Sequence, residues 1–159
     1  MNLRFIVVTA LLGVSATASS QVLSPDGYGK IRFGQRLDQV ERTLGQRATP
    51  RPLDPSCSIV RFQRYPQVSF MVEHGMIVRA DARTVVRNSA GITERMSASD
   101  ALRQAPGMRS ERHKYDEQGQ YLILAQGEDK ALIFESSKGK LTTMRAGLKP
   151  AVDYVEMCG

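Results

Sequence analysis

Few side chains in this chain of 159 residues have the type and spacing that catalysis or metal binding would need. The two histidines, His74 and His113, stand at a predicted turn and at the start of a predicted strand, where most histidines face solvent. No serine or cysteine near them occupies a nucleophile elbow or a dyad motif. Their spacing matches no zinc or calcium motif either. We therefore expect no catalytic residue, no metal site and no cofactor.

Two carboxylates, Glu73 and Glu135, stand at equivalent positions in two similar stretches of the sequence, FMVE and LIFE. A pair of carboxylates can perform general acid and base chemistry, as in glycoside hydrolases. Each of these residues, however, stands where a predicted strand enters a turn, and carboxylates at strand ends are usually solvated. A cell-wall-active hydrolase that uses Glu135 or His113 is therefore an alternative hypothesis.

Residues suited to protein recognition are better represented. Arg61 and Tyr65 lie on or beside predicted strands of the first half of the chain, and Tyr115 and Tyr121 do so in the second half. Arginine and tyrosine dominate binding hot spots because they add contact area and directed hydrogen bonds at limited entropic cost. We take these four residues as candidate protein-binding residues. The alternative is that they flank the sheet and keep it soluble.

The elements that would position these residues begin with a short helix. Leu37, Val40 and Leu44 recur at helical spacing, and Gly45 is placed to end the helix, which predicts a helix over 36–44. The prolines that follow exclude a helix from the next loop. Three strands with β-forming residues come after that loop, at 58–63, 68–73 and 76–81.

The second half of the chain repeats this order. Ser97 and Asp100 have the spacing of a capping box, which predicts a helix over 97–105. Strands follow at 112–115, 121–125, 131–135 and 140–146. We interpret the chain as α+β, with two tandem α-β-β-β repeats at about 27–85 and 90–147 and mainly antiparallel sheets, each packed by a short helix. Chance similarity between the halves is the alternative.

Alternation along the strands predicts the core. Phe70, Val72, Leu132 and Phe134 alternate with more polar neighbours, so we expect these four side chains to be buried. One short helix can hardly cover the sheet of a single unit, which favours a core shared by both halves.

Residues 1–20 have the order of a secretory signal peptide. Arg4 precedes a short apolar run over 5–14, and small residues follow up to Ser20. Cleavage after Ala18 or Ser20 fits, which leaves a single mature domain from about residue 21 to 159, with a tail at 148–159. No cysteine follows either cut to accept a lipid. We therefore expect a soluble periplasmic or secreted protein with no membrane insertion after cleavage. An uncleaved membrane anchor is the alternative, but Gly13 and the small polar residues after it weaken such a helix.

The two cysteines, Cys57 and Cys158, agree with export, because an even number of thiols in an oxidising compartment favours pairing. We predict one disulfide that ties the C-terminal tail to the first half. Free or metal-bound thiols are the alternative, but neither cysteine has a histidine or cysteine neighbour at ligand spacing.

The charge of the mature chain is moderately basic. Without Arg4 it holds 21 basic and 16 acidic residues, with the two signs interspersed. Such a balance is typical of a solvated surface, and it also favours an acidic protein, anionic lipid headgroups or cell-wall polymers as partners. Nucleic acid is not expected, since no stretch combines dense basic residues with interleaved aromatics.

One pattern opens the first half and is followed by strands and a weaker second copy: Gly29-x-Ile31-x-x-Gly34-x-x-x-x-x-Val40-x-x-x-Leu44-Gly45. It resembles the helix-plus-sheet modules of the β-lactamase inhibitor protein and SmpA/OmlA lipoprotein superfamily. The resemblance covers most of the mature chain and implies a binding fold. The chain differs from the lipoproteins in lacking a lipid-accepting cysteine, and from the inhibitor in having one cysteine pair rather than one per module.

These observations predict a small exported protein that binds another envelope or secreted protein without catalysis, as an inhibitor or an immunity-type factor. A factor for envelope assembly or outer-membrane stability is the alternative. The cell-wall-active hydrolase is the second alternative.

Overall fold

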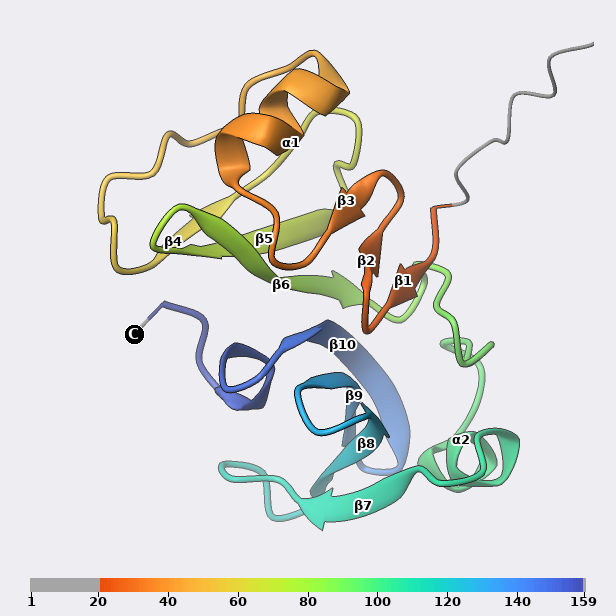
Figure 1. Ribbon diagram of the computed structural model, residues 1–159. Coiled ribbons are helices and arrows are strands. Elements are labelled where there is room, and N and C mark those ends of the chain that lie inside the picture. Colours follow the sequence, from red (N-terminus) through yellow and green to blue (C-terminus); the bar gives the residue numbers. More distant parts are fainter. Residues whose placement is uncertain (1–20, 159) are drawn as a thin grey trace, which may run out of the picture.

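The computed structural model describes residues 21–158, so the predicted leader and its cleavage sites lie outside the described residues. Within this range the fold is α+β, as predicted, with mainly antiparallel sheets and two α-helices (Figure 1). The helices are α1 (Leu37–Leu44) and α2 (Ala98–Gln104). A small three-stranded sheet that the sequence did not predict precedes α1, formed by β1 (Leu23–Ser24), β2 (Gly27–Tyr28) and β3 (Ile31–Arg32).

A seven-stranded sheet contains the strands of both halves, in the order β4-β5-β6-β10-β9-β8-β7. The first half supplies β4 (Ser58–Val60), β5 (Val68–Glu73) and β6 (Met76–Arg83). The second half supplies β7 (Arg109–Arg112), β8 (Gly119–Gln126), β9 (Lys130–Ser137) and β10 (Lys140–Leu148). One expectation is thereby corrected, because the halves share one sheet instead of forming separate sheets. Four strands follow α2, the number expected from the sequence, which is one more than an α-β-β-β unit contains.

The halves join where β6 pairs with β10. Ala80 lies opposite Ala146, and Asp81 lies opposite Arg145. Each half thereby covers a strand edge of the other half, whose backbone groups would otherwise face solvent. This pairing is the reason that one sheet forms.

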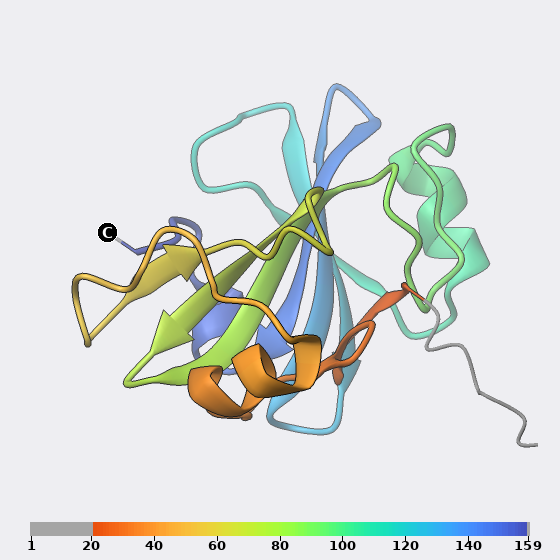
Figure 2. The same cartoon turned by 90° about the horizontal axis from the view of Figure 1, so that it is seen from above.

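Local sequence accounts for the end of α1 and the start of α2. Gly45 ends α1 in the left-handed conformation, with φ 66°, as its position predicts. At the start of α2, Asp100 N donates to Ser97 Oγ at 3.1 Å and Ser97 N donates to Asp100 Oδ2 at 3.1 Å, which is the predicted capping box. Figure 2 shows the β1–β3 sheet between the two helices.

The main core lies between the large sheet and these elements, and it includes residues of both halves. Phe70, Leu132 and Phe134 are 0 % exposed and Val72 is 2 % exposed, so the predicted burial of these four side chains is confirmed. Val40 and Leu44 of α1 reach the same core.

The C-terminal tail, residues 149–158, covers part of the opposite face of the sheet. It forms the 3₁₀ turn η1 (Ala151–Asp153). Val152 packs there against Tyr121 and Ile133. Cys158 of the tail forms a disulfide with Cys57 across a Cα–Cα distance of 5.5 Å. The predicted disulfide is therefore confirmed.

Candidate binding cleft and proline loop

Alternation along β6 places charged side chains on the face of the sheet opposite the helices. Ala80 and Ala82 point into the main core and are buried. Arg79, Asp81 and Arg83 alternate with them and therefore point to the other face. This strand is thus apolar toward the helices and charged toward the tail.

Arg79 binds the C-terminal tail. Its side chain is 2 % exposed, and its Nε donates to Asp81 Oδ2 at 2.9 Å. Its Nη1 donates to Ala151 O at 3.1 Å and to Tyr154 O at 2.7 Å. Burial raises the pKa of the Asp81 carboxyl, although the Arg79 guanidinium opposes this shift.

Arg145 of β10 has an equivalent role. It forms an ion pair with Glu135 of β9, and its Nε donates to Val152 O at 2.7 Å. Thr143 Oγ1 also donates to Glu135, at 3.2 Å. The guanidinium lies 5.2 Å from the centre of the Tyr121 ring, within the range of a cation–π contact.

His113 lies beside Glu135, with 3.7 Å between Nε2 and a carboxylate oxygen. Its Nδ1 accepts hydrogen bonds from the backbone N–H groups of Tyr115 at 3.1 Å and Asp116 at 3.2 Å. An acceptor nitrogen carries no proton, so the neutral ring holds its proton on Nε2, facing Glu135. The ring also stacks on Tyr121. Both ring nitrogens therefore face groups of the protein itself.

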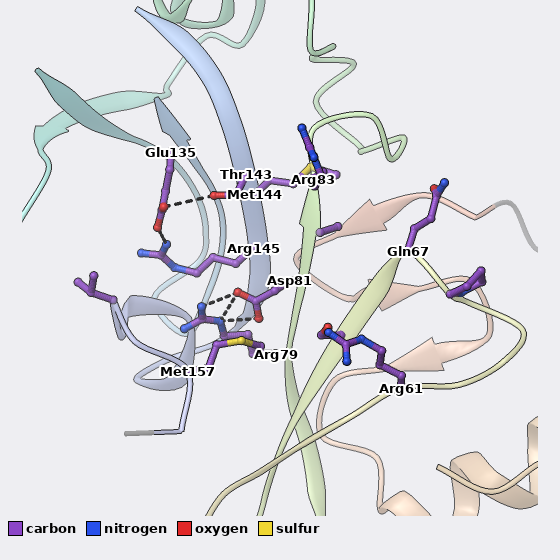
Figure 3. A pocket seen from close by; sticks show the side chains of 14 residues that line it. Arg61, Gln67, Arg79, Asp81, Arg83, Glu135, Thr143, Met144, Arg145 and Met157 are labelled. Atoms are coloured by element: carbon purple, nitrogen blue, oxygen red, sulfur yellow. Dashed lines mark hydrogen bonds and ion pairs between the residues drawn. The ribbon is translucent and has the colours of Figure 1, made fainter. Parts of the chain in front are cut away.

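A cleft of about 390 Å³ opens beside this network. Figure 3 shows Arg61 and Gln67 on one side of the cleft and Met157 of the tail on the other, with Asp81 between them. Val155 adds a second apolar residue on the side of the tail. The cleft therefore combines a polar wall, an apolar wall and a charged floor.

The residues that line the cleft carry more positive than negative charges. Six charged residues contribute: Arg61, Arg79, Arg83, Arg145, Asp81 and Glu135. Arg79 pairs with Asp81, and Arg145 pairs with Glu135. Within residues 21–158, no carboxylate lies within ion-pair distance of Arg61 or Arg83. Both of these arginines are exposed.

Two of the four predicted binding residues are available to a partner. Arg61 lies at the cleft, as just described. Tyr115 is 62 % exposed, and its hydroxyl donates to Glu156 of the tail, a bond that holds the pKa of that carboxyl below its usual value.

The structure corrects the expectation for the other two residues. Tyr65 is 3 % exposed, its hydroxyl accepts the backbone N–H of Lys30 at 3.1 Å, and its ring contacts Tyr28. Tyr121 is 7 % exposed beneath His113. A tyrosine can be buried wherever its hydroxyl finds a partner, and strand position alone does not predict this.

The acid pair of Glu73 and Glu135, which the hydrolase alternative would use, does not form. Glu135 faces the cleft, whereas Glu73 lines a separate hollow beside Cys57. Glu135 instead meets His113, the other residue named for the hydrolase alternative. No group of three or more His, Cys, Asp or Glu side chains in residues 21–158 is arranged to hold a metal ion. None of the helices in that range is long and apolar enough to cross a membrane.

Sequence reasoning missed a second feature, the proline loop, which we define as residues 50–56. Leu53 lies in it and is 94 % exposed. Pro50, Pro52 and Pro55 surround this leucine, and Cys57 follows directly. The signal was present in the sequence, because three prolines around one leucine restrict the backbone conformations that can present it.

Contacts with other elements hold the proline loop in place. Arg51 forms an ion pair with Glu41 of α1, whose side chain is 5 % exposed. His74 N, in the turn between β5 and β6, donates to Pro55 O at 2.9 Å. The loop is therefore fixed to the helix and to the large sheet.

No known protein family, curated protein or solved structure matches this chain. The resemblance to the β-lactamase inhibitor protein and SmpA/OmlA lipoprotein superfamily therefore stays a prediction. The chemistry and geometry of residues 21–158 are the basis for a function.

Proposed function

We propose that the chain is a small exported protein that binds another envelope or secreted protein without catalysis, as an inhibitor or an immunity-type factor. Residues 1–20 would direct export to the periplasm or the medium and then be removed. The disulfide between Cys57 and Cys158 suits such an oxidising compartment. The observation that carries the proposal is the proline loop, which presents Leu53 on a restrained backbone.

Restraint, more than exposure, distinguishes this loop, since a single exposed leucine is common on protein surfaces. Thr49, just before the loop, exchanges two backbone hydrogen bonds with Arg61, at 2.9 and 2.7 Å. Cys57, just after it, is held by the disulfide. Ordering a flexible loop on binding costs conformational entropy, and a loop that is already ordered avoids most of that cost. Leu53 therefore suits insertion into an apolar pocket of a partner.

The hydrolase alternative gains one observation, the contact between His113 and Glu135. A histidine that acts as a general acid or base needs one nitrogen directed at the substrate. Here Nδ1 accepts two backbone N–H groups and Nε2 faces Glu135. This arrangement supports a structural role for His113. Turnover of peptidoglycan or a simple ester that is lost in His113→Ala would establish the alternative.

The test is crosslinked capture from an envelope extract by the mature protein, followed by mass spectrometry and reconstitution with the purified partner. Leu53→Asp should abolish capture, because a charged side chain will not enter an apolar pocket. Val85→Asp is the matched control, since Val85 is also exposed but lies outside the loop. It should retain capture. An inhibitor should also reduce the activity of its purified partner.

Two outcomes would contradict the proposal. Equal capture by wild type and Leu53→Asp would show that the proline loop is not part of the interface. Recovery only with outer-membrane assemblies, with no discrete soluble or secreted partner, would favour the envelope-assembly alternative.

We also propose that the two halves are copies of one α-β-β-β unit, with β7 added in the second copy. In each half, the first residue of the helix donates to the glycine of the last hairpin. Leu37 N reaches Gly75 O at 2.8 Å, and Ala98 N reaches Gly139 O at 3.0 Å. Superposition of 36–83 on 97–148 should bring these glycines together. A different strand order on superposition would contradict the duplication.

A further inference from the structure

The surplus of arginine in the cleft is the starting point. Arg79 and Arg145 neutralise Asp81 and Glu135 through direct ion pairs. The charge that remains therefore comes from Arg61 and Arg83. Exposed arginines in a concave site attract anions, and a guanidinium matches a carboxylate through two parallel hydrogen bonds.

The arrangement of these two arginines favours an extended ligand over a single ion. Figure 3 shows Arg83 and Arg61 on opposite sides of Asp81, so they mark two separate places along the cleft. Met157 and Val155 of the tail supply the apolar wall of the cleft. An extended peptide directs alternate side chains to opposite sides, so it can present acidic and apolar groups at once.

We infer that the cleft binds an extended acidic peptide segment of a protein, with carboxylates at Arg61 and Arg83 and an apolar side chain against the tail. That the segment belongs to a partner protein rests on the proposed function. The preference of the cleft for an acidic peptide is independent of that proposal. A multiply charged phosphate would be less suitable, because the carboxylates of Asp81 and Glu135 also line the cleft.

The test measures binding of a fluorescently labelled peptide of alternating glutamate and valine, about eight residues long, to the disulfide-bonded mature protein. The control peptide carries glutamine in place of glutamate. Arg61→Gln and Arg83→Gln should each weaken binding about tenfold, as expected for loss of one charge-assisted hydrogen-bonded contact. Arg87→Gln removes the same charge from an exposed position outside the cleft and should bind like wild type.

Several results would overturn the inference. One is that the glutamine peptide binds as tightly as the glutamate peptide. Another is that the Arg61→Gln and Arg83→Gln double variant keeps wild-type affinity. The third is that inorganic phosphate displaces the labelled peptide as readily as unlabelled peptide does. Unfolding curves of the variants should match wild type, since both side chains are exposed. The outcome is separable from the proposed function. Loss of partner capture in Leu53→Asp would stand even if the peptide did not bind.

Discussion

Arg79 of β6 and Arg145 of β10 donate hydrogen bonds to successive carbonyls of the C-terminal tail. Arg79 Nη1 reaches Ala151 O at 3.1 Å, and Arg145 Nε reaches Val152 O at 2.7 Å. The two guanidinium-bearing residues are 2 % and 4 % exposed. One arginine comes from each half of the chain, so both halves hold the tail against the sheet where β6 and β10 pair.

Arg79→Met should lower the free energy of unfolding by about 3–5 kcal/mol, because removing one partner of a buried ion pair leaves the other uncompensated. Two tail carbonyls also lose their donor. Urea unfolding measures this change. Arg83→Met is the control, since this exposed arginine lies on the same strand, and it should change stability by no more than about 0.5 kcal/mol. Similar losses in both variants would show that Arg79 has no special role.

Removing the disulfide with Cys57→Ser and Cys158→Ser should cost about 4–5 kcal/mol in the chain-entropy account of a loop of roughly 100 residues. The disulfide and Arg79 hold the same tail, so the losses of unfolding free energy on removing each should not add. In the disulfide-free background, Arg79→Met should therefore cost less than it does in the wild type. A double-mutant cycle by urea unfolding checks this, and additive losses would mean that the tail stays docked without its covalent end.

Stability should depend on pH through Glu41. Burial disfavours the charged form, but hydrogen bonds from Ala48 N, Arg47 and Arg51 outweigh it and hold the pKa of the carboxyl below its ordinary value of 4.5. A carboxyl whose pKa is lowered by folding stabilises the protein above its unfolded pKa. It loses that contribution as the pH falls through the folded pKa. Glu41→Gln should therefore destabilise the protein at neutral pH.

The difference in unfolding free energy between Glu41→Gln and wild type should shrink as the pH falls below 4.5. Urea unfolding between neutral pH and about pH 3 measures it. Glu94→Gln changes an exposed carboxylate elsewhere and is the control. A constant difference across this range would exclude the ionised Glu41 as the stabilising form. Since Glu41 holds Arg51, the same acidification should loosen the proline loop.

The neutral His113 ring should carry its proton on Nε2, which long-range ¹H–¹⁵N NMR can observe directly. His113→Phe keeps an aromatic ring against Tyr121 but removes the acceptor of two backbone hydrogen bonds. Amide hydrogen exchange at Tyr115 and Asp116 should then accelerate about tenfold. Unchanged amide hydrogen exchange, or a proton found on Nδ1, would contradict the hydrogen bonds from the backbone of Tyr115 and Asp116 to His113.

Much of the local structure could be predicted because it depends on neighbouring residues. The spacing of Leu37, Val40 and Leu44 was sufficient for α1, and the capping pattern was sufficient for α2. Of the candidate binding residues, Arg61 and Tyr115 are exposed, whereas Tyr65 and Tyr121 are buried. All four were placed on or beside predicted strands, and the sequence holds no local signal that separates the two outcomes.

The sequence by itself determined the two helices, the hairpin at His74 and the pairing of Cys57, because these follow from short-range spacing or from a count of two cysteines. Only the tertiary structure decided that β6 pairs with β10 and that the tail crosses the charged face. Those contacts join distant parts of the chain, and pairing between strands depends on backbone groups that every residue carries. The cleft and its unpaired arginines exist because of that pairing, so no single stretch of sequence could reveal them.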